Sequence, residues 1–167
     1  MQKENRPIVK IKTTRTDKII EIIACTALIA LWIFIYIIYQ KLHEIIPTHF
    51  DGSGKADGYG EKESVFLSAG ICTVIFIGMS FLQKKVRHFN FLTEITPENA
   101  MRQYTFAIKM VRMLKLSIVI VFGLIEFHTY KASLGMDPAS GKFIILATLA
   151  LVYIPIFYFL IQSSKNM

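Results

Sequence analysis

Cysteine is scarce in this chain, and its two copies, Cys25 and Cys72, both lie within apolar stretches. Two isolated thiols cannot build the cysteine-rich framework of a small secreted domain or a cysteine-based zinc site. We therefore expect both to be buried as small apolar side chains. Patterns of a phosphate-binding loop, a nucleophile elbow and a zinc-binding helix are also missing, so the sequence predicts no catalytic residue, no cofactor and no metal ion.

Charge is missing from four long stretches, and this absence decides the class of protein. The apolar share of 53% is only slightly above that of soluble domains, but the charged residues lie almost entirely between these stretches. Each stretch is close to the length of about 20 residues that crosses a bilayer as a helix, and the remaining pieces are too short to bury a soluble core. The predicted spans are 22–39, 64–82, the apolar part of a helix over 97–130, and 143–162.

The third span is the end of a longer helix. Thr96, Pro97 and Glu98 form a helix start, with a capping threonine, a proline at the first helical position and an acid in the first turn. A helix over 97–130 is about 51 Å long, whereas the hydrocarbon core is about 30 Å thick. We therefore expect its basic first part to lie in the cytoplasm or the interface, with the membrane reached near Met113. Pro155 predicts a kink in the last span.

Lysine and arginine are unequally divided between the two sides of the predicted bundle. Fourteen lie in the N-terminal segment, the connection between the second and third spans, and the C-terminus, against five in the other two loops. The positive-inside rule places both termini in the cytoplasm and the loop between the first two spans outside. We attribute the net charge of +7 to this topology and to contact with anionic lipid, and not to nucleic-acid binding.

The sequence thus predicts an all-α membrane protein, a compact four-helix transmembrane bundle with an extracytoplasmic loop between the first two spans. Its expected parts are a basic cytoplasmic N-terminus (1–18), two spans with the outer loop (19–85), a cytoplasmic connection with a juxtamembrane helix (86–112), and two further spans with a short C-terminus (113–167).

The outer loop carries the most distinctive pattern. Its first part, 44–50, is predicted to be extended. Turn signals follow at Asp51-Gly52, Gly54, Asp57-Gly58 and Gly60. Counting from Asp51, a calcium-binding EF-hand needs a glycine at Ala56 and a glutamate at Lys62, so that spacing fails. Two interpretations stay open: His49 and Asp51 hydrogen-bond the turn backbone and pin the loop over the bundle, or they contact a ligand or a transition metal.

The loop between the first two spans contains three short motifs in order. They are a Pro-x-His segment (Pro47 and His49), a glycine (Gly54) and an Asp-Gly-Tyr segment (Asp57, Gly58 and Tyr59). With Asp51 they form the candidate ligand-binding or structural cluster of the loop. This pattern resembles the domain of unknown function 1648, found in small bacterial membrane proteins and in relatives of the sporulation-delaying-protein immunity protein. The resemblance covers about residues 19–85, and 96–104 resembles the short stand-alone members. It implies a multi-pass protein of the bacterial inner (cytoplasmic) membrane.

Glu126 and His128 are ionisable residues near the outer end of the third span. Such groups are unfavourable within a bilayer and indicate function by default, although near the interface the side chain reaches water. We expect one of them to lie beneath the outer loop and to meet His49 or Lys55. Glu21, at the inner end of the first span, is expected to lie in the interface or to pair with a lysine.

These features favour a non-enzymatic membrane protein with an immunity-like, sensory or regulatory role. Its expected partners are the lipid bilayer and a peptide toxin or another membrane protein. The alternative is a small transporter or permease component, which needs a polar path through the membrane midplane. The central parts of the spans offer only Thr26, Thr73 and Ser117. This argues against transport by a single copy, although an oligomer, whose size the sequence does not indicate, could build a path.

Overall fold

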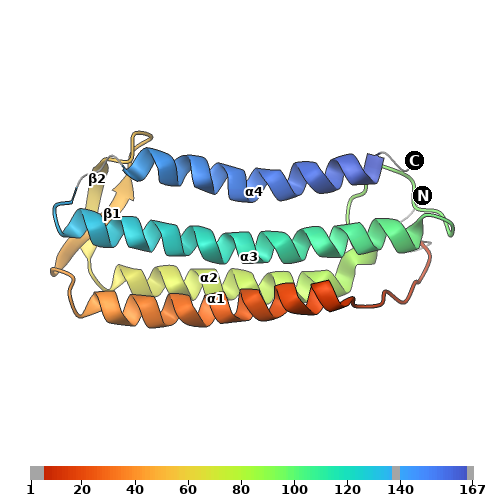
Figure 1. The fold of residues 1–167 in the computed structure, drawn as a ribbon, viewed down its shortest axis with the longest axis horizontal. Coiled ribbons are helices and arrows are strands. Elements are labelled where there is room, and N and C mark those ends of the chain that lie inside the picture. The colour runs from red at the N-terminus through yellow and green to blue at the C-terminus, as the bar shows by residue number, and fades with distance from the viewer. Residues whose placement is uncertain (1–5, 137–139, 165–167) are drawn as a thin grey trace.

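The computed structural model describes residues 6–136 and 140–164. Within these residues, four long helices lie side by side and a two-stranded hairpin closes one end (Figure 1). In chain order the elements are α1 (Arg15–Tyr39), β1 (Ile45–Phe50), β2 (Ala56–Glu61), α2 (Ser64–Leu82), the 3-10 helix η2 (Gln83–His88), α3 (Ala100–Ser133) and α4 (Ser140–Ser164). The four predicted spans lie within the four long helices, and the hairpin corrects the all-α prediction.

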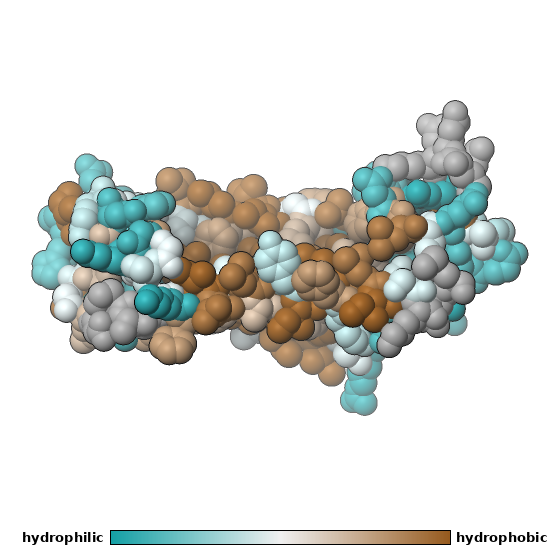
Figure 2. Space-filling model, turned by 90° about the horizontal axis from the view of Figure 1, so that it is seen from above, coloured by the Kyte–Doolittle hydropathy of each residue, from teal (hydrophilic) through white to brown (hydrophobic). Residues whose placement is uncertain are grey.

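Three helices of the described part are long and apolar enough to cross a membrane: α1, the helix Ser64–His88, and Gly141–Ser164 of α4. The surface shows an apolar belt between two polar ends (Figure 2). Exposed apolar surface on this scale needs a covering, and a belt formed by spanning-length helices fits the hydrocarbon core of a bilayer. The chain is a membrane protein.

The helices are arranged around α3. This helix packs against α1, α2 and α4, whereas α4 packs chiefly on α3 (Figure 1). The structure is therefore a three-helix group of α1, α2 and α3 with α4 attached to one side of α3. This attachment follows from the sequence of α4, which is apolar on all sides and has no single face to bury. In the most apolar 18-residue stretch of Gly141–Ser164, only 6% of the residues are buried within the protein.

The apolar core lies between α1, α2 and α3. Its α1 residues are Ala24, Leu31, Ile35 and Ile38, which recur at helical spacing on one face. Cys72 of α2 is buried in this core, as predicted. Cys25 is exposed, so the prediction of its burial is wrong. Adjacent residues of a helix point about 100° apart, so burial of Ala24 turns Cys25 away.

One prediction about the helices needs correction. The turn 97–99 precedes α3, which begins at Ala100 and not at Pro97. The Asn99 side chain accepts a hydrogen bond from the Thr96 N–H (3.0 Å) and donates one to the Glu94 carbonyl (2.9 Å), and these contacts hold the turn. Pro155 lies inside α4, as the predicted span requires, and the kink expected there stays a prediction.

The two ends of the molecule differ in content. At the end opposite the hairpin, the Tyr104 hydroxyl donates to the Pro7 carbonyl (3.3 Å) and the Ser163 hydroxyl donates to the Gln103 side chain (2.5 Å). The first and last described segments therefore meet the start of α3 there (Figure 1). We refer to this end as the terminal end and to the other as the hairpin end.

Candidate functional site

The turn of the hairpin is organised by Asp51. Its carboxylate accepts hydrogen bonds from the Ser53 hydroxyl (2.6 Å), the Lys55 N–H (3.0 Å) and the Ser53 N–H (2.8 Å). These donors hold the pKa of the Asp51 carboxyl below its ordinary value, the Ser53 hydroxyl first among them. The expectation that Asp51 hydrogen-bonds the turn backbone is confirmed.

Ionised Asp51 is expected to stabilise the turn at neutral pH. Because its pKa is lowered by folding, the stabilisation is full above the ordinary aspartate pKa and is lost as the pH falls through the lowered value. Hydrogen exchange of the 51–55 backbone should therefore rise only in this acid range, whereas Asp51→Ala should raise it at neutral pH. Exchange that is unchanged by Asp51→Ala at neutral pH would contradict this role.

Gly58 and Gly60 lie within β2, so their prediction as turn residues is wrong. The strands pair antiparallel, with Gly58 opposite His49 and Tyr59 opposite Pro47. A Cβ atom on Gly58 would lie 2.9 Å from the His49 Cβ, and one on Gly60 would lie 3.1 Å from Thr48 Cγ2. The two glycines leave room for the side chains of β1.

His49 and Asp57 form a pair on the outside of the hairpin. Nδ1 of His49 contacts a carboxylate oxygen of Asp57, and the two side chains are 73% and 47% exposed. His49 thus pairs with a side chain, and the expectation that it bonds the turn backbone is wrong. Exposed pairs contribute little to stability. The pair, next to the exposed Tyr59, is therefore accessible for recognition.

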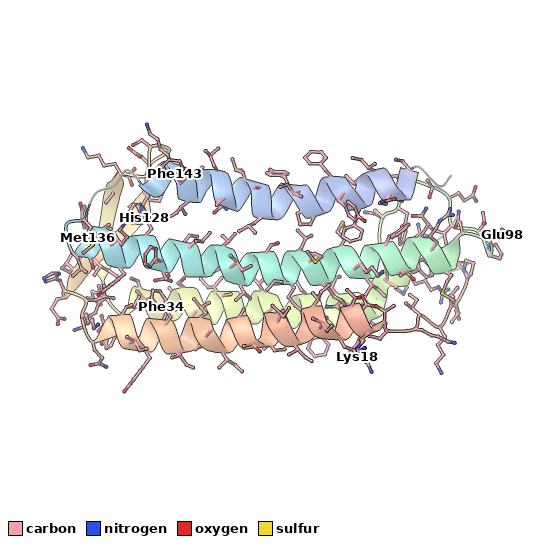
Figure 3. The ribbon with its side chains drawn as sticks, in the orientation of Figure 1. Lys18, Phe34, Glu98, His128, Met136 and Phe143 are labelled. Atoms are coloured by element: carbon pink, nitrogen blue, oxygen red, sulfur yellow. The ribbon has the colours of Figure 1, made fainter. Side chains whose placement is uncertain are left out.

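The hairpin is held against α3 and α4 through Gly54. Its carbonyl lies 3.0 Å from Nε2 of His128, and the His128 ring packs on Phe50 with centroids 4.4 Å apart. Gly54 has φ +83° and its Cα abuts Gly141 at the start of α4. His128 lies at the hairpin end of the molecule (Figure 3). The prediction that His128 lies beneath the loop is confirmed, but its partner is Gly54.

Glu126 faces the interior. It is 4% exposed, its carboxyl hydrogen-bonds Ser68 of α2, and Oε2 has no hydrogen-bond partner among the described residues. The expected contact of Glu126 with His49 or Lys55 is not formed. Side chains two residues apart on a helix point about 200° apart, so Glu126 faces Ser68 of α2 while His128 faces Gly54 of the hairpin.

A cavity of about 230 Å³ lies beneath the hairpin, between α3 and α4. Most of its wall is apolar, and the hairpin forms its roof. Its lining residues are Phe50, Asp51, Gly54, Ile125, His128, Gly141, Ile144, Ile145, Thr148 and Leu149. The parts of the chain that the structure describes contain no group of three histidine, cysteine or acidic side chains placed to hold a metal ion.

A charge cluster near the terminal end was predicted only in part, because Asp17 and the pairing with Arg112 were missed. Arg112 pairs with Asp17 (2.9 Å) and Glu21 (3.2 Å), and Lys115 pairs with Glu21 (2.5 Å). Lys115 is 2% exposed and also donates to the Ser80 hydroxyl (3.0 Å). The prediction of a lysine partner for Glu21 is confirmed. A signal was present, since two acids one turn apart on α1 match two bases one turn apart on α3.

One family model matches part of the chain. The family described as "Domain of unknown function (DUF1648)" matches residues 26–73, which run from α1 through the hairpin into α2. The matched segment is narrower than the 19–85 expected from the resemblance, and it contains the complete hairpin. No curated protein and no solved structure matches the chain.

Proposed function

We propose that this chain, of which residues 26–73 match the DUF1648 family, is a non-enzymatic membrane receptor with an immunity-like or sensory role. Its hairpin recognises a ligand on the outer side of the bacterial cytoplasmic membrane. The expected ligand is a peptide toxin or a segment of another membrane protein.

The proposed topology has four spans, including α3, with both termini in the cytoplasm. The cations of α3 that would oppose insertion, Arg112 and Lys115, are paired with carboxylates of α1, which lowers the cost of a charge within the bilayer. The terminal end carries the basic segments, and this distribution favours a cytoplasmic position for it.

The observation that carries the receptor proposal is the combination at the hairpin end. A polar pair, His49 and Asp57, lies on the exposed face of a hairpin whose underside roofs an apolar cavity. A membrane-active peptide presents an apolar face and a charged face together. Such a ligand matches both features, with apolar side chains entering near Phe50 and a polar group reaching the pair.

The interior of the three packed helices favours a receptor over a transporter. Between Glu126 at one end and Lys115 at the other, the described core of the three packed helices is mostly apolar, with side chains such as Ile35, Cys72 and Val119. Ser117 is a buried polar residue of α3 in this stretch. A single copy therefore offers no continuous polar path within the described residues, and a transport route would need residues of a second copy.

The receptor role is tested by His49→Ala and Asp57→Ala. Both residues are exposed, so we expect the amount of protein in the membrane to stay within about twofold of the parent. Protection of cells against a panel of membrane-active peptide toxins is expected to fall about tenfold, the effect of losing roughly 1.4 kcal/mol of binding. Glu61→Ala, which removes an exposed acid of the same strand, is the matched control. Loss of abundance without specific loss of protection would refute the role.

The topology is tested by labelling single cysteines in a background lacking Cys25 and Cys72. A membrane-impermeant maleimide should label Ser53→Cys, in the hairpin turn, on intact cells. It should label Ser164→Cys, at the end of α4, only after permeabilisation. Labelling of the Ser164→Cys variant on intact cells would overturn the proposed orientation.

A further inference from the structure

A second hollow lies at the terminal end, far from the hairpin. It has a volume of about 340 Å³, within the range of about 300–1,000 Å³ typical of ligand pockets. The hollow lies between α1, α3 and α4, because α4 packs on α3 and leaves a furrow beside α1. Its lining residues are Thr16, Asp17, Ile20, Phe106, Lys109, Met113, Ile154, Pro155, Tyr158 and Phe159.

The furrow is apolar along most of its length and polar toward the terminal end. Ile20, Met113 and Ile154 form apolar walls, which suit a hydrocarbon chain. Thr16 lies one helical turn before Ile20, on the side of the capped start of α1. Lys18 marks the same end of the molecule (Figure 3). The furrow therefore runs from the belt that faces lipid hydrocarbon to the level of the headgroups.

The polar end of the furrow is positive. Lys109 and Asp17 both line it, and the Lys109 charge acts on the Asp17 carboxylate. Lys109 forms no salt bridge among the described residues, whereas Asp17 is paired with Arg112 (2.9 Å). Together with the adjacent cluster of Arg112, Glu21 and Lys115, the cations outnumber the anions by one. The exposed first turn of α1 adds further basic residues, Arg15 and Lys18. A ligand with an apolar tail and a negative head complements this arrangement.

We propose that this furrow binds one anionic phospholipid of the cytoplasmic leaflet. Its phosphate pairs with Lys109, and an acyl chain lies along Ile20, Met113 and Ile154. The proposal uses the orientation given above but does not depend on the receptor role of the hairpin. In the fold, the lipid fills the space between α1 and α4 that no side chain occupies, and it joins α4 to the three packed helices.

The test is native mass spectrometry of the full chain in detergent, titrated with phosphatidylglycerol and, separately, with phosphatidylcholine. We expect one retained phosphatidylglycerol with an affinity about fivefold above that for phosphatidylcholine, the ratio for roughly 1 kcal/mol per basic residue. Lys109→Gln should abolish this preference and Lys109→Arg should keep it. Lys10→Gln, which removes an exposed lysine outside the furrow, is the matched control.

Ile20→Trp fills the furrow and should reduce retention of both lipids. A second measurement keeps the test independent of these variants, because phosphatidylglycerol should raise the melting temperature of the parent protein more than phosphatidylcholine or inorganic phosphate does. Equal binding of the two lipids, no retained lipid, or a dimer that Ile20→Trp dissociates would overturn the proposal. Toxin protection plays no part in these readouts, so the two proposals fail separately.

Discussion

Glu21→Leu is expected to destabilise the folded chain by about 3 kcal/mol or more, because it leaves the Lys115 ammonium buried without an anion. Lys115 is 2% exposed, and its other contacts, the Ser80 hydroxyl at 3.0 Å and the Phe76 ring at 4.5 Å, are neutral. Arg112 keeps its second partner, Asp17, at 2.9 Å. The loss therefore falls on Lys115, and denaturant titration in detergent micelles should measure it as a lower midpoint.

A double variant that also removes the Lys115 charge provides the decisive comparison. Removing both charges in Glu21→Leu/Lys115→Leu should return stability to within about 1–2 kcal/mol of the parent, since replacing a buried ion pair by apolar residues is often neutral. Glu44→Leu is the control, because Glu44 pairs with Lys62 at 2.7 Å but is 82% exposed. Exposed pairs contribute about 0–1 kcal/mol. Equal losses for Glu21→Leu and Glu44→Leu would show that burial of Lys115 is unimportant.

The spans could be read from the sequence because the length of an uncharged run is a local property. The predicted span 64–82 coincides with α2 (Ser64–Leu82). The position of α4 could not be read in the same way. Its apolar residues surround the helix, so no face indicates which neighbour it contacts. The furrow between α1 and α4 results from the packing of α4 on α3, and no local sequence pattern predicts it.

The buried charge cluster illustrates a signal that was present but ambiguous. Lys115 carries a charge close to the apolar part of α3, and charge alone favours a place in the cytoplasm or interface. Only the pairing of α3 with Glu21 of α1 allows Lys115 to be buried. The spacing of acids and bases on two helices hinted at this pairing, but a single sequence does not state which helices are neighbours.

In the hairpin, local turn preference and strand pairing gave different answers. Asp57-Gly58 is a common turn pair, yet it lies within β2, where Gly58 makes room for His49 across the strands. The extended segment and the position of His128 followed from local geometry. The contact of Gly54 with Gly141 did not, because it joins residues far apart in the sequence.

Gly141→Ala is expected to release the hairpin from α4. A Cβ atom at this position would abut the Gly54 Cα and lie 2.8 Å from the Gly54 carbonyl oxygen. Both are backbone atoms and cannot rotate away, so the hairpin must move. Such overpacking costs about 1–3 kcal/mol, which exceeds the gain of up to about 1 kcal/mol from replacing glycine by alanine in a helix. The His128 bond to Gly54 should weaken with it.

Gly123→Ala separates these two effects. Gly123 lies in α3 with nothing within 4 Å of an added Cβ. Only the higher helix propensity of alanine therefore applies, and the variant should be as stable as the parent or more stable. Hydrogen exchange of residues 51–55 should rise in Gly141→Ala and stay unchanged in Gly123→Ala, while both proteins remain in the membrane. Because the roof of the cavity beneath the hairpin depends on this contact, Gly141→Ala should also reduce toxin protection. Unaltered exchange in Gly141→Ala would show that the hairpin is held by other contacts.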